Sequence, residues 1–482
     1  MPTLGTGLAI GKSALRAQQF GLNLVGNNIA NVNTPGYSRK AALIKVETAA
    51  RTGVAGGVKV DGITRQRSTF LDSQARFQSN ILGRLDAKQE LMGVVESIFT
   101  ELAGGGASET NAIFNQPGGA ALSGGFSRFF NAFQDLANNP QSQAGRAQVR
   151  EEASFIIQQF KRMADKLSEL RNEIDIKFKS TVRDINRLTE DIGQMNARIL
   201  AAKAKSTDVA GNLDDERDRL IDELSFLIDT SVRENTDGTL TVTGATGAGV
   251  LLVDGANVVE LGTRGVIRDG ASVSDLTLAA TGEVITVASG KLRGLTEVRD
   301  QEIVSYKQSL DELATKFVER VNAVHSTGFG SDGSTGNDFF APAITVARDI
   351  ALSVDIADNL DKIATASPSA DNANISAGLG DGSIAQAIAD LATERSLGGG
   401  TQSFEEFYAD LQGRIGAEAL EVINDFEGQG LVMQQISNRR ENVRGVSINE
   451  EASDLILFQR GYQAAARIIT TIDEMMQTAL NM

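Results

Sequence analysis

The chain has 482 residues, 41% of them hydrophobic and 22% charged, which is typical of a soluble globular protein with two to four domains. It contains no apolar run long enough to span a membrane, and without cysteine it can form neither disulfides nor thiolate sites for metals or catalysis. A net charge of −16 disfavours a nucleic-acid partner.

The charge is unevenly distributed along the chain. Residues 1–85 carry 11 Lys and Arg against 3 Asp and Glu, a net charge of +8, which leaves −24 on the remainder. Two interpretations stay open: this basic segment attracts the acidic surface of a neighbouring copy, or it is a solvated basic face. The first residues, MPTLGTGLAIGKSALR, lack a basic leading segment and do not resemble a cleaved secretory signal.

Both ends of the chain repeat apolar residues in sevens, which predicts two long helices with narrow apolar seams. Because a seam at this spacing needs another helix to cover it, we expect the two ends to pair. Gly11, Gln18 and Asp473 also fall at core positions, so we expect weak pairing in the monomer and firm pairing where neighbouring copies add contacts. The predicted assembly seam comprises Leu8, Leu15, Leu22, Val25, Ile29, Val32, Ile448, Leu455, Tyr462, Ala466, Ile469 and Met476.

The first half of the chain continues as hairpin and helix. Residues 31–37 (NVNTPGY) predict a loop, because Pro35 blocks a helix and Gly36 permits a positive φ. Residues 41–64 alternate and predict a β-hairpin or extended arm, followed by a helix from about 70 to 102 that Gly104 to Gly106 end. Pro140 opens a helical region to Lys205, a rod of about 90 Å that a break near residues 172–181 would halve.

Two clusters in this half invite a functional interpretation. Phe126, Phe129, Phe130 and Phe133 share one helical stripe, which favours core packing over a ligand site. The predicted helix 212–228 carries four acids, Asp214, Asp215, Glu216 and Asp218. Because Arg217 and Arg219 lie among them, a solvated face is favoured over a cation site.

The second half predicts a β insertion between helices. Residues 230–287 are Gly-rich and alternating, which indicates a small β domain, and helix returns from 291 to 325. Residues 326–400 form a Gly, Asp and Ser-rich outer region with short strands and short helices, an alternative being that it belongs to the β domain. From Ser403 the pattern is helical, with interruptions near 428–430 and 444–447. The fold class is therefore α+β, mainly α, and elongated.

No catalytic constellation emerges. Gly11, Lys12 and Ser13 resemble the end of a phosphate-binding loop, but Thr6 stands where that loop needs glycine, so we interpret the match as coincidence. Residues 331–338 (SDGSTGND) resemble a calcium loop, yet Ala343 replaces the closing Glu, which favours an ordinary turn. A lone histidine, His325, is expected to be structural. The sequence predicts a structural protein, not an enzyme, with no cofactor or metal.

Two terminal blocks resemble a known family. Residues 27–39 (NNIANVNTPGYSR) resemble the signature of the axial proteins of the bacterial flagellum, namely rod, hook and hook-associated proteins. Residues 445–480 are similar to the carboxy-terminal signature of the hook-associated protein 1 family, the first hook–filament junction proteins. Internal blocks resemble the same family in the same order: FSRFFNAFQDLANNP, NLDDERDRLIDELS, GKLRGLTEVRDQ and GFGSDGSTGNDFF.

The resemblance implies an elongated subunit with four parts. Residues 1–37 and 446–482 would form an inner-tube domain, and residues 38–229, 288–325 and 401–445 a helical rod. Residues 230–287 would be an inserted β domain and 326–400 an outer region, both short for the family. The family's turn out of the tube maps onto Asn28, Asn31, Asn33, Thr34, Pro35, Gly36 and Tyr37.

The resemblance also implies location and partners. Members leave the cell through the flagellar type III system and form a helical ring at the hook–filament junction, where they adapt the hook lattice to the filament. Their partners are hook protein, the second hook–filament junction protein and an export chaperone at the C-terminal helices, with no nucleic acid or membrane. The alternatives are a hook or distal rod protein, or a secreted enzyme using carboxylates of the β region, with axial-protein ends only for export.

Overall fold

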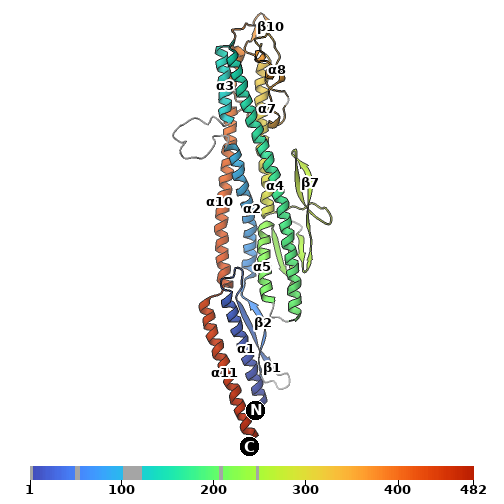
Figure 1. Ribbon diagram of the computed structural model, residues 1–482, viewed down its shortest axis with the longest axis vertical. Helices are drawn as coiled ribbons and strands as arrows, with labels where there is room; N and C mark the ends of the chain where they lie inside the picture. The colour runs from blue at the N-terminus through green and yellow to red at the C-terminus, as the bar shows by residue number, and fades with distance from the viewer. Residues whose placement is uncertain are drawn as a thin grey trace.

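The protein is an elongated, mainly helical molecule whose two termini lie at the same end (Figure 1). The computed structural model describes residues 4–48, 55–100, 122–205, 210–245, 249–342 and 344–481. Helix α8 and strand β10 lie at the end opposite the termini, and the long helices run along the axis between (Figure 1). Within the described ranges, no helix is both long enough and apolar enough to cross a bilayer.

The terminal part contains two helices and a hairpin. Helix α1 spans Leu4–Ala30 and α11 spans Ile448–Leu480, which confirms a helix at each end. Strands β1 (Lys40–Thr48) and β2 (Ala55–Arg65) pair antiparallel, so the predicted hairpin is confirmed. Helix α1 lies between α11 and this hairpin, where the amide of Val58 donates a 3.2 Å hydrogen bond to Ser13 Oγ.

Long helices make up the rod. They are α2 (Thr69–Thr100), α3 (Leu122–Asn138), α4 (Gln143–Lys205), α5 (Ala210–Leu227), α7 (Ile303–His325) and α10 (Phe404–Arg444). The 63 residues of α4 form one unbroken helix, about 95 Å at 1.5 Å per residue, so the predicted rod lacks the break near 172–181. The predicted helix end at Gly104 to Gly106 lies outside the described residues.

Helix α10 and the segment 291–325 differ in part from the helix boundaries predicted from the sequence. The predicted interruption at residues 428–430 is wrong, because α10 runs through both glycines. Each glycine costs a helix about 1 kcal/mol relative to alanine, and packing of α10 along α2 outweighs that cost. The interruption near 444–447 is confirmed, since α10 ends at Arg444. The predicted helix 291–325 is α6 (Lys291–Glu297) and α7, joined by a π-helical segment, Val298–Glu302.

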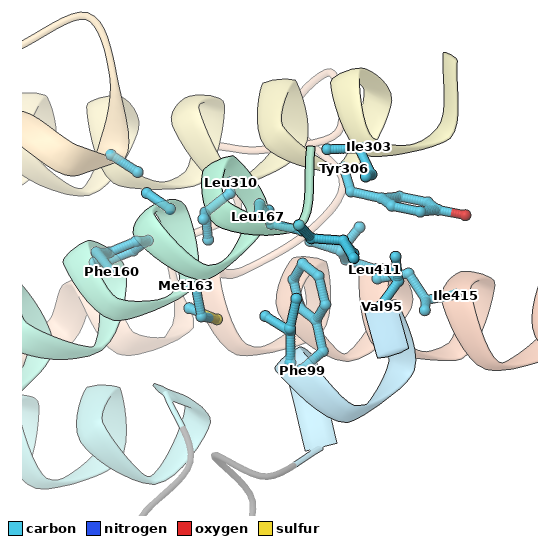
Figure 2. Close-up of a cluster of buried hydrophobic side chains, with 14 of the residues drawn as sticks. Val95, Phe99, Phe160, Met163, Leu167, Ile303, Tyr306, Leu310, Leu411 and Ile415 are labelled. Carbon is cyan, nitrogen blue, oxygen red and sulfur yellow. The ribbon is translucent and has the colours of Figure 1, made fainter. Parts of the chain in front are cut away.

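Side chains from α2, α4, α7 and α10 meet in the core of the rod. Figure 2 shows Val95 and Phe99 of α2 beside Met163 and Leu167 of α4, with Tyr306 of α7 and Leu411 of α10 completing the cluster. The aromatic stripe of α3 joins the same core. Its four phenylalanines are at most 3% exposed, and the rings of Phe126 and Phe129 pack edge-to-face on Phe317 at 5.1 and 5.3 Å.

Residues 230–287 form two small antiparallel sheets beside α4 (Figure 1). The first holds β3 (Thr230–Glu234), β4 (Leu240–Gly244), β5 (Val250–Asp254) and β6 (Asn257–Val258) in that order. The second pairs β7 (Leu261–Arg268) with β8 (Ala271–Leu278). The side-chain amides of Asn186 and Asn196 of α4 each donate to the backbone carbonyl and accept from the backbone amide of Leu261 and Leu240, respectively, which attaches the sheets to the rod.

The Gly, Asp and Ser-rich region folds over the far end of the rod. It contains α8 (Val354–Asp358), α9 (Ser383–Asp390), β9 (Pro368–Ser369), β10 (Asn372–Ser376) and three 3-10 turns, Ala347–Asp349, Leu360–Lys362 and Leu391–Thr393. Fully buried His325 anchors it, since Nδ1 donates to the carbonyl of Asn337 and Nε2 accepts from the amide of Ala364, both at 2.8 Å. Burial lowers the pKa of His325 to about 4, so it is a neutral structural residue, as predicted.

Candidate functional site

The two terminal helices pack antiparallel through glycines that receive large side chains of the partner helix. A Cβ added at Gly7 would lie 3.1 Å from Ile472, at Gly11 2.9 Å from Ile469, and at Gly21 2.5 Å from Phe458. The side chain of Gln18 approaches Gly461 in the same way. Glycine has no Cβ, so it lets the helices come close and seats a bulky neighbour. Gly11, predicted to weaken the seam, is therefore a contact position.

The predicted assembly seam and the contact between the two terminal helices of this chain share only part of their residues. The column containing Gly11, Gln18 and Val25 does face α11, but the other α1 column lies at Gly7, Gly21 and Asn28, one residue before the predicted leucines. In α11 the facing columns run through Glu451, Phe458, Ala465 and Ile472, and through Leu455, Ile469 and Met476.

The predicted seam residues therefore differ in burial. Val25 is buried, whereas Leu8, Leu15, Leu22, Ile29 and Val32 are half-buried, as are Leu455, Ala466, Ile469 and Met476. Ile448 is 56% exposed and Tyr462 36% exposed in this chain, so their part in a seam covered by neighbouring copies stays a prediction. The repeat in sevens is carried by large apolar residues, whereas the contact between α1 and α11 places large side chains against glycines.

The turn after α1 is built around buried Asn28. Its Nδ2 donates to the carbonyl of Lys40 at 2.9 Å and to Glu451 Oε2 at 3.0 Å, and its Oδ1 accepts from the amide of Lys40 at 3.1 Å. The hydroxyl of Tyr37 lies 2.8 Å from the same oxygen. Burial first, then the charges of Asp215 and Glu451, raises the pKa of Tyr37 to about 12. Every polar atom of the Asn28 amide is thus used to close the turn.

The remaining turn residues shape the backbone and leave the tip exposed. Gly36 has φ +84°, a conformation that favours glycine, and the amide of Tyr37 bonds back to the carbonyl of Thr34 at 3.2 Å. The side-chain amide of Asn31 donates to the carbonyl of Asn27 at 2.8 Å. Asn33, Thr34 and Pro35 lie exposed at the tip.

Arg39 ties this turn to the first helical turn of α11. Its guanidinium lies 2.6 Å from Glu451, 3.0 Å from Asp454 and 3.3 Å from Glu450, and its amide donates to the carbonyl of Arg444. The hydrogen bond to Glu451 is the largest influence that raises the pKa of Arg39. Asn28 and Arg39 therefore fix where both terminal helices leave the rod.

A second ion network joins the hairpin to the rod. Arg65 of β2 lies 2.9 Å from both Asp215 and Asp218 of α5, and Arg76 of α2 lies 2.9 Å from Asp222. Arg440 of α10 completes it, 2.8 Å from Asp222 and 3.0 Å from Asp72. Such networks of partly buried, bidentate arginines hold elements in one relative orientation.

This network corrects the interpretation of the acidic cluster. Asp214, Asp215 and Asp218 are not a solvated face, because their side chains are at most 13% exposed and paired with arginine, although Glu216 is exposed as predicted. Arg217 of α5 pairs with Asp214 at 2.9 Å, but the other partners, among them Arg65 and Arg76, come from the basic first 85 residues. Part of that charge is therefore neutralised within the same chain. Burial raises the pKa of Asp218, but Arg67, Arg65 and Arg76 outweigh burial and the net shift is downward.

The two motifs that resemble a phosphate-binding loop and a calcium loop form ordinary helix and turn structure. Gly11, Lys12 and Ser13 lie in the middle of α1, which confirms that they are not a phosphate-binding loop. Residues 331–338 make a turn in which Asp332 Oδ1 accepts from the amide of Ser334 at 2.9 Å. In the described part of the chain, no group of three or more His, Asp or Glu side chains is arranged to hold a metal ion.

Three family models match the chain. That of the flagella basal body rod protein matches residues 8–37, that of the flagellar hook-associated protein FlgK helical domain matches 107–340, and that of the flagellar basal body rod FlgEFG protein C-terminal region matches 442–482. Flagellar hook-associated protein 1 of Bacillus subtilis (strain 168) is 28% identical over 98% of this chain and 97% of its own length. The chain belongs to the flagellar hook-associated protein 1 family.

Further comparisons agree with this family. Flagellar hook-associated protein 1 of Escherichia coli (strain K12) is 24% identical over 97% of this chain and 98% of its own length. The solved flagellar hook junction protein FlgK from Burkholderia pseudomallei has a TM-score of 0.62 and 16% identity, and the match covers 78% of this chain and all of that one. At this identity the solved structure supports the fold alone. The N- and C-terminal family matches contain Asn28 and Glu451, so the polar cluster joins the two terminal segments that the family models match.

Proposed function

We propose that this protein is a structural subunit that assembles on the tip of the flagellar hook and adapts its lattice to that of the filament. The cluster of Asn28, Arg39 and Glu451 carries the proposal, because it fixes the terminal helix pair at one orientation to the rod. A subunit that links two lattices needs such a defined angle between its inner and outer parts. Curated relatives with this full-length similarity are named hook-associated protein 1, not hook or rod protein.

The proposed domain assignment follows the four parts of the chain. Residues 1–37 and 446–482 form the inner-tube domain, and the helical rod consists of 38–229, 288–325 and 401–445. The β insertion 230–287 and the region 326–400 form outer surfaces. The subunit forms a helical ring of identical copies, with hook protein below and the second hook–filament junction protein above. It is exported through the flagellar type III system, receives its chaperone at the C-terminal helices, and has no enzymatic activity.

Deletion and localisation test this function. Cells lacking the protein should build hooks without filaments and release filament protein into the medium, and the intact gene should restore filaments. Antibody-gold labelling of isolated hook–filament structures should mark the junction between the two. Normal filaments in the deletion strain, or label distributed along the hook, would show that the proposed function is wrong.

A further inference from the structure

Arg146 of α4 is a buried cation that forms no ion pair with a carboxylate of the described residues. It is 1% exposed. Its Nη2 donates to the carbonyl of Pro140 at 2.9 Å and to Thr365 Oγ1 at 3.2 Å, and its Nη1 donates to the carbonyl of Ile363. Its Nε has no hydrogen-bond partner in the described part of the chain. Neutral dipoles alone therefore stabilise this charge, so a second positive charge nearby would be costly.

The only histidine of the chain holds the same segment as Arg146. We call residues 360–366 the strap. His325, the last residue of α7, is fully buried, and its Nε2 accepts a 2.8 Å hydrogen bond from the amide of Ala364. Ala364 lies between Ile363 and Thr365, the two strap residues that Arg146 binds. The strap is thus held by α4 through Arg146 and by α7 through His325.

The strap in turn holds the turn that follows α7. The amide of Phe329 donates to the carbonyl of Ala366 at 2.8 Å, and the amide of Ser331 donates to the carbonyl of Asp361 at 2.7 Å. Helix α8 ends at Asp358, two residues before the strap begins. Release of the strap would therefore free both the turn at residues 329–337 and α8.

His325 is surrounded by charged side chains, of which Arg146 acts on the ring. Burial, more than the charge of Arg146, lowers the pKa of His325 to about 4, although its hydrogen bond to Asn337 acts in the opposite direction. Both lowering effects disfavour the imidazolium in the closed structure. Further charged side chains in the segments around the ring are Arg150, Arg320, Asp332, Asp338, Asp355 and Lys362.

Two carboxylates that hold the strap region stay ionised in mild acid. A hydrogen bond from Ser331 is the largest influence that lowers the pKa of Asp361. Burial raises the pKa of Asp381, which lies before α9, but hydrogen bonds from Ser383 and Ser367 outweigh burial and lower it to about 2. Protonation of these acids therefore does not precede protonation of His325.

We infer that protonation of His325 in mild acid releases the strap, together with α8 and the turn after α7, from the rod. A proton on Nε2 would face the amide of Ala364, so two donors would meet where a hydrogen bond now lies. The imidazolium would also lie near the buried charge of Arg146, and opening of the strap would place it in water instead. Helix α8 lies at the end opposite the termini (Figure 1), so the inference does not depend on the proposed function.

The pH dependence has a definite sign. In the open strap the ring is hydrated and has its ordinary pKa of 6.5, against about 4 in the closed strap. Between these values the open form binds more protons, so the closed form loses stability as the pH falls from 6.5 to about 4. His325 contributes no further loss below that range. The opening equilibrium of the strap should therefore increase about 100-fold between pH 7 and pH 4.

Hydrogen exchange of the full-length protein at pH 7 and pH 4 tests the release. After correction for the intrinsic pH dependence of exchange, the strap amides should open about 100-fold more often at pH 4, whereas the amides of α3 and α7 should stay protected. His325→Gln keeps an amide that can donate to Asn337 and accept from Ala364, but it takes up no proton. Opening of the strap in this variant should change by less than about fivefold between the two pH values.

The single histidine also permits a direct titration, because one isotope-labelled imidazole gives one nuclear magnetic resonance signal. Its pKa should be about 4 in the wild-type protein. Arg146→Gln removes the buried charge and keeps amide donors, so it should raise this pKa by about half a pH unit. Arg150→Gln is the matched control. Arg150 lies one helical turn further along α4 and donates to the carbonyl of Ala357 rather than to the strap, so its replacement should leave the pKa unchanged.

Several results would overturn the inference. They are an imidazole that titrates near its ordinary pKa while the strap stays protected at pH 4, and equal acid opening in the wild-type protein and His325→Gln. Should His325→Gln open the strap already at pH 7, the titrations decide: a pKa raised by Arg146→Gln supports the inference, and an unchanged one overturns it. The proposed function is tested separately by deletion and localisation.

Discussion

Glu451 Oε1 accepts a 2.6 Å hydrogen bond from Arg39 Nε, although 412 residues separate the two in sequence. The Glu451 side chain is 1% exposed, and its second oxygen accepts from Asn28. Burying a carboxylate is unfavourable unless both of its oxygens are hydrogen-bonded. Glu451 meets this condition only when the first turn of α11 lies beside Asn28 and Arg39, so it fixes the position of α11 relative to the turn after α1.

Arg39→Ala should loosen both ends while the rod stays folded. Removing one partner leaves Glu451 buried with Asn28 as its main donor, which for a buried ion pair costs about 3 kcal/mol. Limited proteolysis should then release the termini faster and leave a core of approximately residues 70 to 440. Arg187→Ala removes a pair in which both side chains are more than 40% exposed and should not change the digestion. Equal digestion of wild type and Arg39→Ala would contradict the role of this cluster.

Gly21→Ala should destabilise the terminal helix pair, although alanine ordinarily stabilises a helix by about 1 kcal/mol over glycine. The new Cβ would lie 2.5 Å from the ring of Phe458, which must then shift. Gly26→Ala is the matched control, because no atom lies within 4 Å of its Cβ, and it should be neutral or stabilising. Hydrogen exchange of α1 amides should be faster in the first variant and unchanged or slower in the second. The reverse order would show that Phe458 does not occupy this hole.

Val25→Asp should disrupt the terminal pair more than Leu22→Asp does. Val25 is 3% exposed and Leu22 half-buried, and an unpaired carboxylate costs more the less water reaches it. Both variants should keep a folded rod by near-ultraviolet circular dichroism, and motility should fall further with Val25→Asp. Comparable loss from both would favour the seam predicted from large apolar residues, covered by neighbouring copies.

Asp218→Asn should destabilise the protein at pH 7 and less at pH 3. The pKa of Asp218 is lower in the folded state than the value of about 3.9 in the unfolded chain, so its ionised form contributes stability above that value. This contribution is lost as the pH falls through the folded-state pKa. Urea unfolding at the two pH values should show the difference from wild type shrinking in acid. Glu216→Gln, which removes an exposed pair with Arg219, should give a smaller difference at pH 7.

Periodicity predicted the helices well and the contacts between them less well. Repeats in sevens locate α1 and α11, but in each helix one of the two columns of large apolar residues lies a single residue away from the contact with the other helix. Glycine, asparagine and glutamate carry no apolar signal, yet Gly21 is a hole for Phe458 and Asn28 bonds to Glu451. The interruption predicted at residues 428–430 failed for the opposite reason. The low helix propensity of its two glycines is outweighed by the packing of α10 against α2.

The charged network could not have been derived from local patterns. Arg65 and Asp218 are 153 residues apart, and four acids in one helical segment resemble a solvated face when no partner is visible. The sequence indicated this network only through the basic first 85 residues and the acidic remainder. That charge distribution is equally compatible with ion pairs between copies and with a solvated basic face.

By itself the sequence determined the helical ends, the aromatic core stripe of α3, the hairpin, the β insertion and, through its terminal blocks, the flagellar family. These features depend on periodicity, turn chemistry and short motifs, which are local properties of a chain. Only the tertiary structure decided that glycines seat the large residues of the opposite helix, that Asn28 and Arg39 enclose Glu451, and that three aspartates of α5 pair with arginines of the first 85 residues. Those relationships join residues far apart in sequence, and their energies depend on close approach and on exclusion of water.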